Sequence, residues 1–139
     1  MSNNKELFRL SIPVRITDLN YGNHLGNDAL VSILHESRAA WLKGYGLTEL
    51  EAGGVGMIMT ELHVVYKAEG FYGDELEIII SKHEHSSRGF TLHYLVSKHS
   101  NEKKITVAEA TTKMLCYDYS LKKVAGLSAA LRKALLVEP

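Results

Sequence analysis

The sequence of 139 residues has little of several features that mark particular classes of protein. Cys116 is the single cysteine, so no disulfide can form within the chain, which is typical of a reducing compartment such as the cytoplasm. Only two prolines occur, Pro13 and Pro139, and no Pro-, Gly- or Ser-rich stretch divides the chain. We therefore expect a single domain over residues 1–139.

Net charge and long apolar runs are absent as well. Sixteen basic and sixteen acidic side chains cancel, so no overall field attracts nucleic acid or an anionic membrane. The longest apolar stretches have about the length of a strand, and residues 1–10 lack the apolar core of a signal peptide. The sequence predicts a soluble, cytoplasmic protein with no nucleic-acid or membrane partner. No phosphate loop, dinucleotide fingerprint or zinc signature is present, so we expect no metal and no resident cofactor.

Residues 28–43 have the spacing of an amphipathic helix. Small or apolar residues follow the i, i+3, i+4 rule at Leu30, Ile33, Leu34, Ser37, Ala40, Trp41 and Gly44. Asn27 is interpreted as the N-cap, and Lys43 with Gly44 suits the helix end. Because further apolar residues lie off this stripe, we expect the helix to be buried on several sides.

Segments typical of strands lie on both sides of this helix. Residues 7–16 precede it, and residues 57–67, 76–81, 90–98 and 105–118 follow it, connected as a meander. One face of the last segment carries the small or slender residues Thr106, Ala108, Ala110, Thr112, Met114 and Cys116, which would let a helix approach closely. A short helix over 128–136 ends the chain. The pattern predicts an α+β fold in which a curved antiparallel sheet of about five strands wraps one long helix. Its open edge favours pairing in a dimer.

The segment most indicative of chemistry lies just before the long helix. Residues 18–27 read Asp-Leu-Asn-Tyr-Gly-Asn-His-Leu-Gly-Asn. Glycines let the backbone turn and approach a ligand, and the first helical turn presents unpaired N–H groups at the positive end of the helix dipole. A carbonyl oxygen placed there would be polarised. Asp18 and Asp28 are also common as turn formers and caps, and such a turn can be purely structural.

This segment, followed by His35-Glu36-Ser37-Arg38, resembles the signature of 4-hydroxybenzoyl-CoA thioesterase-like hotdog proteins. That signature reads Asp-x-Asp-x-x-Gly-His-Val-Asn-Asn, then an aromatic residue, then Glu-x-Ala-Arg. The resemblance implies a hotdog fold, a homodimer or homotetramer, and hydrolysis of an acyl-CoA thioester at a cleft between subunits. Coenzyme A then enters as part of the substrate.

The resemblance also implies roles for residues near the helix start. The backbone N–H of Asn27 corresponds to the donor that holds the thioester carbonyl, and Asn20 stands where the family has its catalytic aspartate. An amide cannot ionise, so Asn20 would position a water or the thioester. His24, Glu36, Glu61 and His63 are the candidates for the base. His24 comes first because histidine is a common general base, although its alternative role is a hydrogen bond that fixes the loop. Glu36 is expected beside the buried stripe, paired or catalytic.

The phosphates of coenzyme A require cationic contacts, for which Lys67, Arg88 and Lys103 are candidates at strand ends or turns. Two other functions stay open on the same fold. One is a hydratase or dehydratase acting on an acyl thioester. The other is a protein that binds acyl-CoA without turnover, which the loss of the motif aspartate favours.

Overall fold

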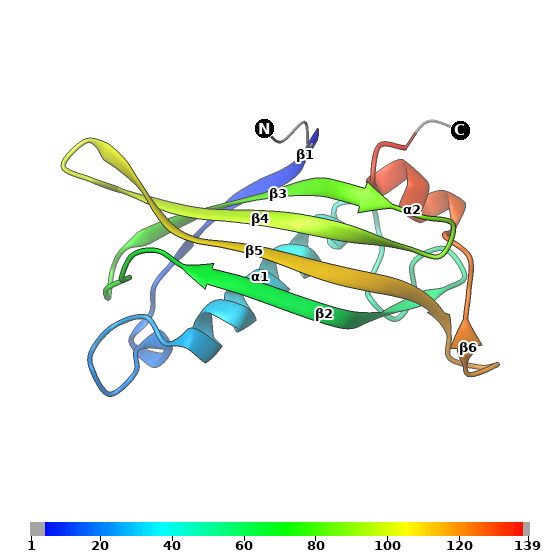
Figure 1. The fold of residues 1–139 in the computed structure, drawn as a ribbon, viewed down its shortest axis with the longest axis horizontal. Helices are drawn as coiled ribbons and strands as arrows, with labels where there is room; N and C mark the ends of the chain where they lie inside the picture. The colour runs from blue at the N-terminus through cyan, green and yellow to red at the C-terminus, as the bar shows by residue number, and fades with distance from the viewer. Residues whose placement is uncertain (1–4, 138–139) are drawn as a thin grey trace.

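The computed structural model describes residues 5–137, which form one curved sheet, one long helix and one short helix (Figure 1). The strands are β1 (Lys5–Pro13), β2 (Gly56–Tyr66), β3 (Glu75–His85), β4 (Gly89–Ser100), β5 (Lys103–Asp118) and β6 (Lys123–Val124), and the helices are α1 (Asn27–Lys43) and α2 (Ala129–Ala134). The sheet order is β1-β3-β4-β5-β2, with β6 paired to β5, and every pairing is antiparallel. This is the predicted hotdog arrangement.

The core lies between the inner face of the sheet and α1. Alternate residues of β3 (Leu76, Ile78, Ile80) and of β4 (Leu92, Tyr94, Val96) have no exposed surface. Each such aliphatic side chain stabilises the fold by about 1.5–3 kcal/mol relative to exposure. The row on β5 from Ala108 to Cys116 is also buried, which confirms its predicted packing role. Burial raises the pKa of the Cys116 thiol, which has no disulfide partner.

The expected meander is wrong for one strand. β3, β4 and β5 follow one another, but β2 pairs with β5 at the sheet edge instead of with β3. Alternation of side chains indicates a strand without identifying its neighbour, and the connection 67–74 runs across the end of the sheet to reach β3. β1 also ends at Pro13, earlier than predicted, and residues 16–18 form a single 3-10 turn.

Two expectations for α1 need correction. Its N-cap is Gly26, in extended conformation and without a side-chain cap hydrogen bond, so Asn27 is the first helical residue. The helix is also buried on one side only: Ser32, Glu36 and Ala39 are exposed in this chain. The sheet covers one face of α1. The apolar residues outside that face are too few to require a second layer that would bury them. Neither helix of the described chain is long and apolar enough to cross a bilayer.

A buried polar network joins α1 to the sheet. The guanidinium of Arg38 donates to the hydroxyl of Tyr94 at 3.2 Å and to the Glu49 carboxylate at 3.3 Å. The Tyr94 hydroxyl lies 2.8 Å from that of Thr112. A buried cation is tolerated only when its donors are satisfied, so this network ties the helix to β4 and to the loop after the helix.

Candidate active site

A hollow of about 320 Å³ opens beside the first turn of α1. It is lined by Asn20, His24, Leu25, Asn27, Tyr66, Lys67, Ala68 and Glu69. The loop before α1 and the connection between β2 and β3 meet here, at one end of the sheet (Figure 1). The fold therefore brings Asn20, His24 and Asn27 together, and it adds Lys67 from the end of β2.

The loop is held in shape by its own polar groups. The side-chain oxygen of Asn20 accepts hydrogen bonds from the amides of Gly22 at 2.8 Å and His24 at 3.3 Å. Only the NH₂ group of Asn20 is left to face a ligand, so this residue can donate but cannot act as a base. At the other side of the loop, the Asp18 carboxylate bonds to the amide and the guanidinium of Arg15. Burial opposes ionisation of Asp18, but these bonds lower its pKa.

Asn23 explains one departure from the family pattern. It stands where the signature has glycine, and its φ is 64°, in the left-handed region. Asparagine tolerates this region better than most other non-glycine residues. The exchange of glycine and asparagine between positions 22 and 23 therefore preserves the turn. The amide of Asn23 bonds to the carbonyl of Asn20 at 3.0 Å, which closes it.

The start of α1 offers unpaired donors. Gly26 provides no side-chain cap, and within residues 5–137 the amides of Asn27 and Asp28 have no hydrogen-bond acceptor. The hydroxyl of Tyr66 donates to the carbonyl of Asn27 at 3.1 Å, which fixes β2 against the first turn. Asn27 lines the hollow, and its free amide together with the helix dipole favours negative charge there.

His24 has an acidic neighbour in the hollow. Its Nε2 lies 3.5 Å from a carboxylate oxygen of Glu69, and its ring meets the ring of Phe71 edge-to-face at 5.3 Å between centroids. A carboxylate beside one ring nitrogen can orient the imidazole. The pair can thus take a proton from a water held in the hollow.

A family model described as the thioesterase-like superfamily matches residues 14–135. The chain belongs to the thioesterase-like superfamily. No curated protein sequence matches it.

Solved structures share the fold of this superfamily member at low sequence identity. A 1,4-dihydroxy-2-naphthoyl-CoA thioesterase from Synechocystis has a TM-score of 0.82 and 19% identity over 93% of this chain and 95% of that chain. A putative thioesterase from Pseudomonas aeruginosa has a TM-score of 0.84 and 18% identity over 94% and 99%. A gentisyl-coenzyme A thioesterase has a TM-score of 0.78 and 18% identity over 92% and 99%.

The structure does not bring the two predicted carboxylates to this hollow. Glu36 lies on the exposed side of α1 and lines a different hollow with Arg15, Ser32 and the end of β1. Helical residues nine positions apart are separated by more than two turns, and the stripe that faces the sheet excludes Glu36. Glu61 points from β2 to the outer face of the sheet, where its carboxylate lies 3.7 Å from the amine of Lys113. An extra residue at Thr60 shifts the alternation of β2 and sets this direction.

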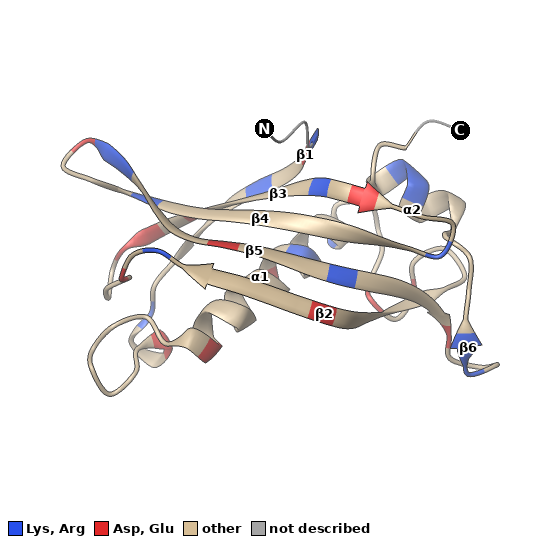
Figure 2. Ribbon diagram, in the orientation of Figure 1, with Lys and Arg blue, Asp and Glu red and all other residues tan. Residues whose placement is uncertain are grey.

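The three residues predicted to contact the phosphates lie in different parts of the fold. Lys67 lines the hollow, although its amine is paired with Glu109 at 2.6 Å. Arg88 lies in the turn between β3 and β4, at the opposite end of the sheet. Lys103 is exposed at the start of β5 and does not line the hollow. Along the described part of the chain, Lys and Arg positions are interspersed with Asp and Glu positions on the strands and helices (Figure 2).

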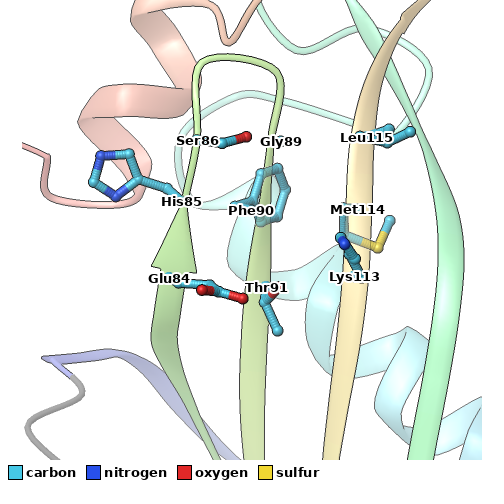
Figure 3. A pocket seen from close by; sticks show the side chains of 9 residues that line it. All are labelled: Glu84, His85, Ser86, Gly89, Phe90, Thr91, Lys113, Met114 and Leu115. Atoms are coloured by element: carbon cyan, nitrogen blue, oxygen red, sulfur yellow. The ribbon is translucent and has the colours of Figure 1, made fainter.

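A hollow at the opposite end of the sheet lacks the features of a reaction site. It has a volume of about 190 Å³ on the outer face beside the β3–β4 turn (Figure 3). Gly89 lines it, and a Cβ at this position would collide with the carbonyl oxygen of Met114. Glu84 and Lys113 reach it from β3 and β5, and the ring of His85 points away from it. Its lining residues belong to β3, β4, β5 and the β3–β4 turn and include neither helix start, so we do not place the thioester in it.

Glu69 and Phe71 are site residues that no sequence motif predicted. Both belong to the connection 67–74 between β2 and β3. The available signal was Gly70: a Cβ at this position would lie 2.9 Å from the Cβ of Leu25. The amide of Leu25 bonds to the carbonyl of Gly70 at 2.8 Å. A glycine between an acidic and an aromatic residue can indicate such close contact between two loops.

Proposed function

We propose that this protein hydrolyses an acyl-CoA thioester to a free acid and coenzyme A in the hollow at the start of α1. The observation that carries the proposal is that Asn20, His24 and Glu69 line one hollow together with Asn27, whose backbone amide at the start of α1 is unpaired within the described chain. Membership of the thioesterase-like superfamily supports it. Two of the structural neighbours are named as thioesterases of aromatic acyl-CoA substrates.

The steps follow from the chemistry of these groups. The thioester carbonyl oxygen would lie against the amide of Asn27, where the negative charge of the tetrahedral intermediate is stabilised. His24, oriented by Glu69, would take a proton from the attacking water, and the NH₂ of Asn20 would hold that water or the thioester. The proton then passes to the leaving sulfur. Oxyanion donors of this kind contribute about 10²–10³-fold in kcat. Lys67 is the proposed phosphate contact within the chain.

We also propose a homodimer formed through the β2 edges. β2 and β1 are the two edge strands of the sheet, and β2 is the longer, with 11 residues against 9. Its side chains Met59, Leu62 and Tyr66, which face the helix side, are 43%, 37% and 47% exposed. An open apolar edge favours pairing with another strand, whereas the β1 edge is protected by Pro13 and by charged residues. A second protomer paired with β2 would form one side of the hollow, next to Tyr66 and Lys67. Sedimentation should give twice the 15.5 kDa of one chain, or four times for a tetramer.

The cytoplasmic location and the lack of a resident cofactor stay predictions. The first rests on the single buried cysteine, and the second on a reaction that needs only water.

The direct test is a free-thiol release screen with short, long and aromatic acyl-CoA substrates. We expect turnover of at least one substrate, with aromatic acyl groups tested first. His24→Ala should lower kcat by about 10²-fold or more. The matched control is His85→Ala, an exposed histidine at the opposite end of the sheet. Binding by calorimetry without thiol release would instead support a non-catalytic acyl-CoA binder. Equal activity of His24→Ala and wild type would refute the assignment of the base.

A further inference from the structure

Lys98 is a buried cation that the proposed reaction does not use. It lies near the end of β4 and is only 7% exposed. Its ammonium donates to the carbonyl oxygen of Glu69 at 2.7 Å and to the carboxylate of Asp74 at 2.8 Å. It also lies 4.8 Å from the centroid of the Phe71 ring. A buried ammonium needs such compensation, so these contacts set where the 69–74 loop lies relative to the sheet.

The Asp74 carboxylate closes the same loop on itself. The oxygen that accepts from Lys98 also accepts from the amide of Phe71 at 2.8 Å. The amide of Asp74 bonds to the carbonyl of Phe71 at 3.0 Å, and Gly73 has a φ of 86° that permits this turn. Burial opposes ionisation of Asp74, but the bonds from Lys98 and Phe71 and the charge of Lys98 lower its pKa. These contacts join Lys98 to the 69–74 loop, and we call the set of Lys98, Glu69, Phe71 and Asp74 the clamp.

The clamped loop is also the part of the chain that touches His24. Glu69 lies 3.5 Å from the His24 Nε2, and the Phe71 ring meets the His24 ring edge-to-face. Two of the three groups held by Lys98 thus belong to the residues that flank the imidazole. The carbonyl of Gly70, between them, accepts the amide of Leu25 and joins the clamp to the helix start.

We propose that Lys98 is a positioning residue: its ammonium holds the 69–74 loop so that Glu69 and Phe71 fix the His24 ring in the hollow. The catalytic consequence rests on the proposed function. The position of the ring does not, and it can be measured separately.

The ring position is tested by NMR of the His24 ring C–H groups, which feel the ring current of Phe71. Lys98→Met removes the charge and keeps the length of the side chain, whereas Lys98→Arg keeps the charge. The matched control is Lys104→Met, because Lys104 is 47% exposed on β5, pairs with Glu77 at 3.3 Å and does not touch the loop. We expect the His24 signals to move toward those of free histidine in Lys98→Met, to move less in Lys98→Arg, and to stay in place in Lys104→Met.

If Lys98→Met does not fold, Asp74→Asn tests the same contacts. It removes the charge that pairs with Lys98 and leaves the side-chain volume nearly unchanged. His24 signals that stay unchanged in the folded clamp variants would overturn the proposal.

The kinetic test uses the thiol-release assay. Lys98→Met should lower kcat by about 10-fold or more with KM within about twofold, because misplacing a group by 1 Å can cost 10²-fold. In a His24→Ala background the same change should cost nothing further, since residues acting through one another are not additive. Full additivity would overturn the proposal. If the wild type releases no thiol, the proposed function fails, and the NMR result still decides the role of Lys98.

Discussion

Asn20 gives the sharpest test of how the loop before α1 works. Asn20→Ala removes an acceptor that holds two backbone amides, at 2.8 and 3.3 Å, in an exposed loop. Each such bond contributes about 0.5–1.5 kcal/mol, and solvent exposure places these two bonds at the lower end, so we expect a total loss of about 1 kcal/mol. Asn20→Asp keeps the acceptor and gives it charge, so its free energy of unfolding should equal or exceed that of the wild type.

The two variants should differ in activity as well. The second carboxylate oxygen of Asn20→Asp would replace the NH₂ group that faces the hollow, and a carboxylate there can act as a base. We expect Asn20→Asp to raise kcat by about 10-fold or more, and Asn20→Ala to lower it. Denaturant unfolding and thiol release measure the two effects on one sample. The reasoning is refuted if Asn20→Ala unfolds like the wild type, or if Asn20→Asp is less active than Asn20→Ala.

Two further predictions concern groups away from the reacting atoms. Tyr94→Phe leaves the buried Arg38 guanidinium and the Thr112 hydroxyl each short of a partner, so denaturant unfolding should show a loss of about 2–4 kcal/mol with kcat unchanged. A native fold of undiminished stability would contradict the network. The lowered pKa of Asp74 means that its contribution to stability is present above about pH 4 and is lost as the pH falls through its folded-state pKa. Asp74→Asn should therefore be less stable than the wild type at pH 6, with a difference that shrinks in acid; a constant difference would contradict this.

The fold was predictable because its signals are local and agree with one another. The stripe from Leu30 to Trp41 identifies the face of α1 that is buried. The row of small residues on β5 identifies the face of the sheet that packs against it. The sheet order was not predictable, because β2 and β3 are adjacent in sequence and nothing in their alternation shows that two other strands lie between them.

The site was predictable only where it is continuous in sequence. Asn20, His24 and Asn27 belong to one motif, and the start of a helix brings them to one hollow. The directions of Glu36 and Glu61 were predicted from helix and strand periodicity. The burial of α1 on one side only leaves Glu36 exposed, and the bulge at Thr60 changes the direction of Glu61. Glu69 and Phe71 reach His24 through tertiary contact alone, so no local pattern assigns them to the site.

The central claim is that the amide of Asn27 holds the thioester oxygen, and it is tested most directly by replacing that amide. Proline is well tolerated at the first helical position, and Gly26 already has the extended conformation that a following proline requires, with φ −70° and ψ 151°. Asn27→Pro therefore removes the N–H while keeping the helix, and Asn27→Ala removes only the side chain. The account predicts a kcat for Asn27→Pro about 10²-fold below that of Asn27→Ala, with both variants folded. Equal kcat values in the two variants would contradict it.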